Sequence, residues 1–334
     1  MTTSTQIQLS KRPVGTPTSE NFATVTEELA ALGVDEVRVL NEFVSVDPYM
    51  RGRMNDSESY IAPFAVKETM TGGAVGRVVE STSDALPVGT AVLHSYGWRD
   101  VAQAPAKHFS ALPETGLPLS VFLGAAGMTG LTAYAGIKRI ARLTAGDVVF
   151  ISGAAGAVGS MAGQIARKLG AVRVIGSAGS AEKVALLKDR YGFDDAFNYK
   201  DAPVRRQLRS ATPDGIDVYF DNVGGDHLEA ALDRLNTGGR AALCGAISQY
   251  NDTQRSPGPD NLANIVTRSL MLRGFIVSQH EDLKDEFTEQ ITRWLADGSV
   301  VFDETVVEGI DHAVDAFLDM MSGANTGKMI VRTA

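Results

Sequence analysis

The sequence has only one cysteine, Cys244, among its 334 residues. A single cysteine excludes a disulfide within the chain, and it also excludes a cysteine-rich zinc site. The five histidines are scattered, and none follows the His-Glu-x-x-His spacing of a zinc hydrolase. We therefore expect no bound catalytic metal and a cytoplasmic protein, since a reducing compartment suits a chain without disulfides.

Long apolar runs and excess positive charge are also missing. No stretch approaches the roughly 20 apolar residues that a membrane helix needs, and Met1–Ser10 lacks the apolar core of a signal peptide. The formal net charge is −9, which argues against general nucleic-acid binding. We expect neither a membrane nor a nucleic acid as a partner. The length is sufficient for two domains with a large core.

The chain changes its pattern after its first third. Up to about residue 125, short apolar runs are interrupted by Gly, Pro, Asp and Ser, which predicts a compact β-rich unit. From Val148 onward, strand-like and helical runs alternate, as in βαβ units. Six strands are predicted near 148–152, 172–177, 195–198, 216–221, 240–245 and 269–276. The helices between them are predicted near 157–170, 180–191, 202–211, 225–236 and 281–297. This order predicts an α/β fold with a doubly wound, parallel, six-stranded sheet.

The first of these strands ends in a glycine-rich turn that leads directly into a helix. Such a turn lets a pyrophosphate approach the backbone, where free helical N–H groups and the helix dipole favour negative charge. Ala154 stands where the G-x-G-x-x-G pattern has its first glycine, whereas the other two are present. We predict that the turn binds a dinucleotide through Gly156, Ala157, Val158 and Gly159. The alternative is a glycine-rich helix start without a ligand.

The end of the second strand indicates which dinucleotide binds. NAD-binding folds place an acidic residue about 20 residues after the glycines, where it bonds the ribose 2′-hydroxyl. Here the strand ends in Gly176-Ser177-Ala178-Gly179-Ser180, without an acid, and Lys183 follows. A 2′-phosphate would be attracted by Lys183, by Ser177 and by the helix N-terminus. For Lys183 alone, a solvated helix lysine would be the better interpretation, but together with the missing acid the pattern predicts NADPH.

Several motifs resemble the zinc-independent medium-chain dehydrogenase/reductases, in particular the leukotriene B4 dehydrogenase, prostaglandin reductase and NADPH-dependent enone (alkenal) reductase group. The resemblance covers nearly the whole chain. Besides the turn, it rests on Val46–Arg51, Gly127–Tyr134, Phe197–Lys200, Phe220–Gly225, Cys244–Asn251, Arg273–Phe275 and Asn325–Lys328. The zinc ligands of the related alcohol dehydrogenases are absent from the corresponding stretches, Ser45–Asp47 and Met70–Gly73.

The resemblance implies a fold with two domains. A GroES-like β-rich substrate and catalytic domain would comprise residues 1–125 and 300–334. A Rossmann domain that binds NADPH would comprise residues 126–299. The family is commonly dimeric, so a homodimer is expected, and the apolar run Ser269–Phe275 could form its edge strand.

The resemblance also assigns roles to individual residues. Lys183 and Tyr199 would hold the adenosine 2′-phosphate, and Asn222 would contact the ribose or nicotinamide side. Thr132, Phe275 and Asn325 lie in motifs that wall the nicotinamide pocket. For Tyr199, a purely structural role at a strand end is the alternative, and base rates for large aromatic residues favour it.

The implied reaction is metal-free hydride transfer to the β carbon of an α,β-unsaturated ketone or aldehyde. Negative charge then develops on the carbonyl oxygen, and hydroxyl groups can stabilise it by hydrogen bonds. The nicotinamide ribose 2′-hydroxyl and Tyr250 are the expected donors, and Tyr49 is a second catalytic candidate. Either Tyr250 or water could deliver the proton to the α carbon.

Two other functions stay open from the sequence. A quinone reductase would use the same fold and cofactor, because quinones are conjugated enones. A non-catalytic NADPH-binding regulatory protein is the alternative from a different class, since fold alone does not imply activity. The candidate donors Tyr49 and Tyr250 favour an oxidoreductase, whose substrate would be a small enone or alkenal.

Overall fold

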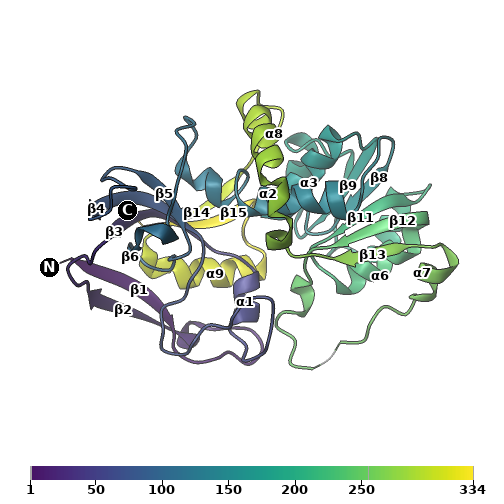
Figure 1. Ribbon diagram of the computed structural model, residues 1–334. Helices are drawn as coiled ribbons and strands as arrows, with labels where there is room; N and C mark the ends of the chain where they lie inside the picture. Colours follow the sequence, from purple (N-terminus) through teal and green to yellow (C-terminus); the bar gives the residue numbers. More distant parts are fainter. Residues whose placement is uncertain (1, 255, 334) are drawn as a thin grey trace. The chain divides into compact units, whose positions relative to one another are not determined.

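The computed structural model describes residues 2–254 and 256–333. It divides into two compact units, coloured along the chain in Figure 1. Unit 1 contains Met1–Leu123 and Glu304–Ala334, and unit 2 contains Gly124–Asp303. Within the described ranges, no helix has both the length and the apolar character that crossing a bilayer requires.

Unit 2 is built on a six-stranded parallel sheet in the order β10-β9-β8-β11-β12-β13. The strands are β8 (Val148–Ile151), β9 (Arg173–Ala178), β10 (Asp195–Asn198), β11 (Ile216–Asp221), β12 (Leu235–Leu243) and β13 (Met271–Gly274). The predicted doubly wound Rossmann sheet is confirmed. The direction of winding reverses between β8 and β11, and in such sheets ligands bind beyond the carboxyl ends of the strands at this point.

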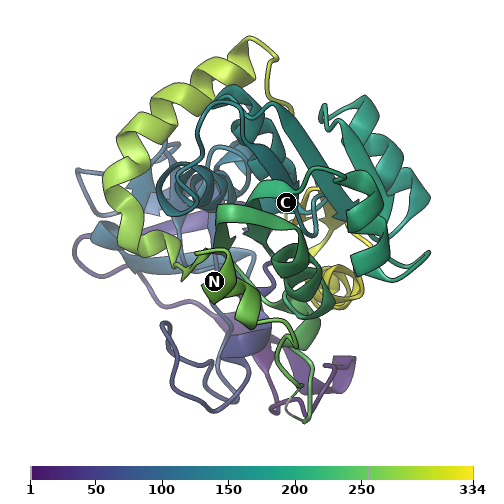
Figure 2. The ribbon, with the colours of Figure 1, turned by 90° about the vertical axis from the view of Figure 1, so that its right-hand side faces the viewer.

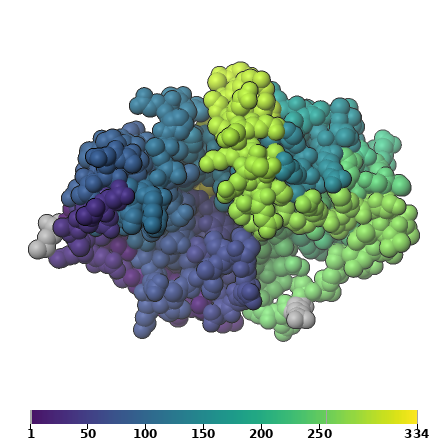
Figure 3. Space-filling view, viewed as in Figure 1, coloured from purple at the N-terminus to yellow at the C-terminus, as the bar shows by residue number. Residues whose placement is uncertain are grey.

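Helices cover both faces of this sheet. The first half of the unit contributes α3 (Ala157–Lys168), which packs on α2 (Met128–Ala135), and α4 (Ala181–Asp189). The second half contributes α5 (Val204–Ala211), α6 (Gly225–Arg234) and α7 (Ala263–Thr267), of which α5 and α7 each contact α6. Figure 2 shows α8 (Lys284–Ala296) as a long yellow-green helix. Phe287, Ile291 and Trp294 form its buried side, and the outer side is visible in Figure 3.

Unit 1 is the β-rich, GroES-like part. Its main sheet has the order β14-β15-β3-β4-β5-β7, and β6 pairs with β3. These strands are β3 (Glu36–Ser45), β4 (Ala74–Ser81), β5 (Ala91–His94), β6 (Val101–Pro105), β7 (Ser110–Ala111), β14 (Glu304–Glu308) and β15 (Lys328–Arg332). A separate hairpin joins β1 (Thr3–Leu9) to β2 (Phe22–Glu28). Helices α1 (Tyr49–Arg53) and α9 (Ala313–Ser322) complete the unit.

A buried ion pair connects the two sequence segments of unit 1. The Lys328 ammonium lies 3.1 Å from an Asp47 carboxylate oxygen, and both side chains are about 95% buried. Lys328 also donates to the Val46 carbonyl at 2.7 Å, and the Ser45 hydroxyl donates to Asp47. A buried charge needs such partners because its desolvation is costly. The last strand therefore fixes the turn that precedes Tyr49.

In unit 2, the starts of two elements differ from the predicted ones by more than two residues. Strand β12 begins at Leu235 and not near 240, because Leu235 pairs with Ile216 before the register shifts. Helix α8 begins at Lys284, after a 3-10 segment over Val277–Leu283 that holds a non-helical His280. Helix α7 is not among the predicted helices, because a helix of this length has too few turns to produce an apolar period that can be recognised in the sequence.

Candidate functional site

The glycine-rich turn leads directly into helix α3. Gly156 is the N-cap of α3, with φ −82°, and Ala157, Val158 and Gly159 form the first helical turn. A Cβ atom at Gly159 would lie 2.4 Å from the Gly153 carbonyl oxygen, so close packing of helix and turn requires this glycine. A Cβ atom at Gly156 would meet only that oxygen, at 3.4 Å. Neither φ nor a protein contact demands a glycine at 156, so the protein itself leaves this position open to a side chain.

The tips of β8 and β11 are joined by a buried hydrogen-bond network. One oxygen of Asp221 accepts from the Tyr219 hydroxyl at 2.6 Å, the Ser152 hydroxyl at 3.0 Å and the Gly224 N–H at 2.8 Å. Asn222 donates its side-chain N–H to the Ser152 carbonyl at 2.8 Å. Burial raises the pKa of Asp221 despite these donors. The network holds Asn222 beside the glycine-rich turn, next to Gly153.

Polar and positively charged groups gather at the tips of β9 and β10. The Ser177 hydroxyl is buried without a hydrogen-bond partner among the described residues. The ring of Tyr199 lies against Gly179, where a Cβ atom would be 3.0 Å from the phenol oxygen. Burial and the nearby charge of Lys200 lower the pKa of Lys183. Lysines close enough to repel each other, beside an unsatisfied hydroxyl, suit a dianion such as a 2′-phosphate.

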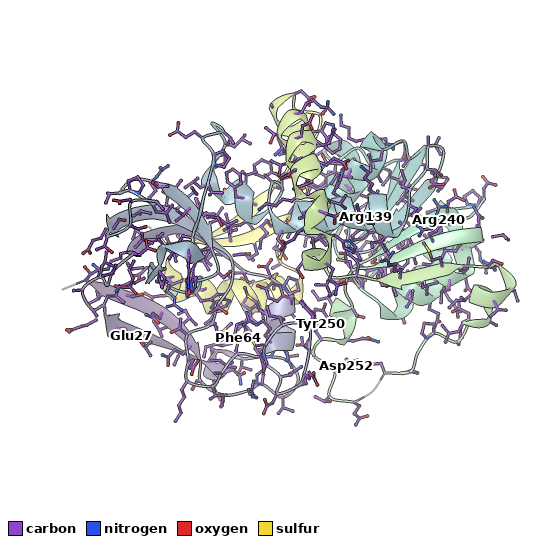
Figure 4. All side chains as sticks on the ribbon, in the orientation of Figure 1. Glu27, Phe64, Arg139, Arg240, Tyr250 and Asp252 are labelled. Atoms are coloured by element: carbon purple, nitrogen blue, oxygen red, sulfur yellow. The ribbon has the colours of Figure 1, made fainter. Side chains whose placement is uncertain are left out.

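Tyr250 lies in the segment that follows β12, after the 3-10 turn Ile247–Gln249, and is labelled in Figure 4. Its oxygen accepts a long hydrogen bond of 3.5 Å from the Ala246 N–H. Burial, and to a lesser extent Cys244 and Asp221, raise the pKa of this phenol. Tyr250 is therefore protonated at neutral pH, and its hydrogen is available for another acceptor.

Tyr49 is the first residue of α1 in unit 1 and is half-buried. Burial raises the pKa of the phenol strongly, and the charge of Asp47 adds to this effect. The positive charge of Arg53 opposes this increase in the pKa. Like Tyr250, Tyr49 therefore keeps its proton at neutral pH and can act as a hydrogen-bond donor.

The three residues expected to wall the nicotinamide pocket have different surroundings. The Thr132 hydroxyl donates to the Met128 carbonyl within α2, at 2.7 Å. Phe275 follows β13, is buried, and packs edge-on against Phe220 with the ring centroids 6.4 Å apart. Asn325 belongs to unit 1, where its side chain donates to the Gly327 carbonyl at 2.9 Å. The pocket-forming roles of all three stay predictions.

Comparison with known proteins gives two family matches. Residues 5–112 match the model described as the N-terminal domain of oxidoreductase, and residues 157–296 match the model described as zinc-binding dehydrogenase. Prostaglandin reductase 1 of Sus scrofa is 42% identical over 97% of both chains. The NADP(+)-dependent 2-alkenal reductase of Nicotiana tabacum is 40% identical over 90% of this chain and 88% of its own.

A solved structure matches along almost the full length. CurA of Vibrio vulnificus, crystallised with NADPH, is 40% identical, has a TM-score of 0.94 and covers 99% of both chains. The chain belongs to the zinc-independent medium-chain dehydrogenase/reductases. The resemblance drawn from the motifs is thereby confirmed. Within the described parts of this family member, no three His, Cys, Asp or Glu side chains group into a possible metal site.

Three residues of this dehydrogenase/reductase were missed by the sequence reasoning although two of them lie inside quoted motifs. Asp221 organises the tip of β11, and Lys200 stands next to Lys183. The charge of Arg53 acts on the pKa of Tyr49. A charged residue directly beside a predicted site residue was the available signal in each motif, but only the fold shows which neighbours it meets.

Proposed function

We propose that the protein is an NADPH-dependent reductase of activated C=C bonds in α,β-unsaturated ketones and aldehydes. Its group membership supports this function, because relatives of 40% identity or more include NADP(+)-dependent 2-alkenal reductase and prostaglandin reductase 1. The observation in this chain that carries the proposal is the acid-free tip of β9, where Ser177, Lys183 and Lys200 provide a site for a 2′-phosphate.

The predicted cofactor-binding residues would act as follows. The first turn of α3, from Gly156 to Gly159, would bind the pyrophosphate with its N–H groups. Ser177, Lys183 and Tyr199 would bind the 2′-phosphate end, and Asn222 would contact the ribose or nicotinamide side. Thr132, Phe275 and Asn325 would wall the nicotinamide. When bound, NADPH supplies the hydride for the β carbon.

Two phenols would serve the substrate. As electron density moves to the carbonyl oxygen, Tyr250 would donate a hydrogen bond to it, and this bond strengthens as the charge grows. The raised pKa of the phenol keeps its proton in place at neutral pH. Tyr49 would contact the substrate and could donate a second hydrogen bond, with its pKa raised in the same way.

A rate comparison tests the function. Purified protein is mixed with NADPH or NADH and with a 2-alkenone, a 2-alkenal or a benzoquinone, and cofactor oxidation is followed. We expect the highest kcat/KM with NADPH and an enone or enal, and saturated product at the former C=C bond. A clear preference for the quinone would favour a quinone reductase. Tight NADPH binding without turnover of any substrate would favour a regulatory protein.

The assembly and location are separate parts of the proposal. We propose a homodimer that pairs through β13, because this strand ends the six-stranded sheet and Arg273 and Gly274 are exposed there. Light scattering after size exclusion tests it, and a monomer at micromolar concentration would contradict it.

We place the enzyme in the cytoplasm because its single cysteine, Cys244, suits a reducing compartment. Fractionation of the source cells tests this location.

A further inference from the structure

The ring of His227 supports Tyr199, although neither the motifs nor the proposed reaction gives His227 a role. His227 lies in the first turn of α6, which is labelled in Figure 1. Its ring meets that of Tyr199 edge-on, with the centroids 5.4 Å apart and the planes at 76°. His227 is buried, whereas Tyr199 is 38% exposed. A buried ring thus lies against a partly exposed one at the end of β10.

The ring of His227 itself rests on the core of unit 2. It is stacked on Phe150, with the centroids 6.5 Å apart and the planes at 7°. Phe150 is fully buried and stacks in turn on Phe197 and Tyr219, at 5.8 Å and 5.3 Å between centroids. Rings packed in this way cannot move without disturbing their neighbours. His227 is therefore a fixed support for the side chain of Tyr199.

The supported ring places the Tyr199 hydroxyl beside the start of α4. A Cβ atom at Gly179 would be 3.0 Å from the phenol oxygen, and Gly179 directly precedes Ser180, the N-cap of α4. The Ser180 hydroxyl accepts from the Lys183 N–H at 3.3 Å, so Lys183 belongs to this first turn. A helix N-terminus favours anions through its free N–H groups and its dipole. The phenol oxygen therefore lies next to the residues that would bind the 2′-phosphate.

The imidazole has no polar interaction that would explain a histidine at this position. Its Nε2 atom is buried and has no hydrogen-bond partner within the described parts of the chain. Burial lowers the pKa of His227 to about 4, so the ring is neutral at neutral pH and offers a phosphate no charge. Its ring contacts with Phe150 and Tyr199 are the interactions through which it can act.

We propose that His227 is a positioning residue for NADPH: its ring holds Tyr199 so that the phenol hydroxyl stays beside Gly179 and can donate a hydrogen bond to the 2′-phosphate. This inference rests on the proposed function, in which Tyr199 binds the 2′-phosphate end. It adds that part of the preference for NADPH over NADH comes from a buried ring on α6, which acts only through Tyr199. A side chain that is already fixed loses less entropy when the cofactor binds.

The experiment measures the dissociation constants of NADPH and NADH for full-length wild type, His227→Ala, Tyr199→Phe and the double variant. Tyr199→Phe should weaken NADPH binding by about tenfold or more, because it removes a hydrogen bond to a charged group. His227→Ala should weaken it by about three- to tenfold, which corresponds to the entropy of ordering one side chain. NADH binding should change by less than about twofold in each variant. The double variant should bind NADPH no more weakly than Tyr199→Phe, because residues that act through one another are not additive.

Two further variants separate positioning from a general loss of stability. His227→Phe keeps an aromatic ring against Phe150 and Tyr199, and it should keep the ratio of the two dissociation constants within about twofold of wild type. Leu232→Ala removes a fully buried side chain from the same helix. It should lower the melting temperature as His227→Ala does, because both leave a cavity, but it should not change the ratio.

Three results would overturn the role of His227 and leave the proposed reduction intact. They are a wild-type ratio in His227→Ala, additive losses in the double variant, and an equal change of the ratio in Leu232→Ala. A loss in His227→Phe as large as that in His227→Ala would also overturn it, because the nitrogen atoms and not the ring would then be required. A wild-type protein that binds NADPH no more tightly than NADH would overturn the proposed cofactor, and this inference with it.

Discussion

Alanine at Gly159 should lower the stability of the protein, whereas alanine at Gly156 should weaken NADPH binding, although the two glycines are only three residues apart in one turn. At Gly159 the new methyl group would lie 2.4 Å from the Gly153 oxygen and 2.8 Å from the Ala154 Cα atom. An ordinary contact begins at 3.4 Å, so the helix or the turn must move by 3.4 − 2.4 = 1.0 Å. Both obstructing atoms belong to the backbone, so no side-chain rotation relieves the clash.

Overpacking of this kind costs about 1–3 kcal/mol. For a unit of this size, about 2–4 °C is lost per kcal/mol, so the melting temperature of Gly159→Ala should fall by about 2–12 °C. At Gly156 the methyl group meets only an ordinary contact of 3.4 Å, and φ of −82° suits alanine. The stability of cofactor-free Gly156→Ala should therefore stay within about 0.5 kcal/mol of wild type.

For NADPH affinity, Gly156→Ala is the variant that should differ from wild type. If the pyrophosphate passes over Gly156, the methyl group should lower NADPH affinity by about 10–100-fold, which equals about 1.4–2.8 kcal/mol. Calorimetric melting of the cofactor-free protein and NADPH titration by fluorescence provide the two measurements. Unchanged stability of Gly159→Ala would refute the close approach of helix and turn. Unchanged NADPH affinity of Gly156→Ala would refute the placement of the pyrophosphate.

Three further substitutions test the cofactor end, the donor and the pH response. Lys183→Ala should weaken NADPH binding by about tenfold or more and leave NADH binding unchanged, since only NADPH carries the 2′-phosphate; Lys188→Ala on the same helix is the control, and equal effects on both cofactors would reject the assignment. Tyr250→Phe should lower kcat by about 100-fold with little change in the dissociation constant of NADPH, and unchanged turnover would remove Tyr250 from the mechanism. Burial, assisted by Arg99, lowers the pKa of His94 to about 3. The unfolded chain therefore binds the extra proton first, so unit 1 should lose stability as the pH falls from about 6.5 towards 3. The stability advantage of wild type over His94→Gln should shrink across this range, and a constant difference would contradict the burial of a neutral His94.

The fold was largely predictable because its elements have strong local patterns. Runs such as Val148–Ile151 are short, apolar and bounded by glycine, and they alternate with helical periods, which is sufficient to predict a parallel sheet. The start of β12 at Leu235 was missed, because its first residues Leu235–Gly239 include two glycines and pair only partly with β11. Pairing between distant segments decides such boundaries, and local patterns do not contain it.

The candidate site was predictable only where a residue works through its own backbone or its immediate neighbours. The close approach at Gly159 follows from the strand-turn-helix pattern alone. By contrast, the edge-on contact of His227 with Tyr199, with ring centroids 5.4 Å apart, joins α6 to the end of β10. The contacts of Arg53 reach as far as Thr71. Such contacts depend on the fold of the whole unit, and a single sequence gives no sign of them.

The pairing of Lys328 with Asp47 has a consequence for synthesis on the ribosome. Strand β15 pairs with β3 across most of the chain, with Ile330 opposite Ser45. Unit 2 lies between these partners in the sequence, so all of its residues leave the ribosome before Lys328 does. Until β15 has been synthesised, Asp47 is therefore a solvated carboxylate without its Lys328 partner. The pairing then closes a very long loop, which is entropically costly and slow. The turn that carries Tyr49 can thus reach its final form only after β15 has been synthesised, and a nascent chain lacks the completed turn until then.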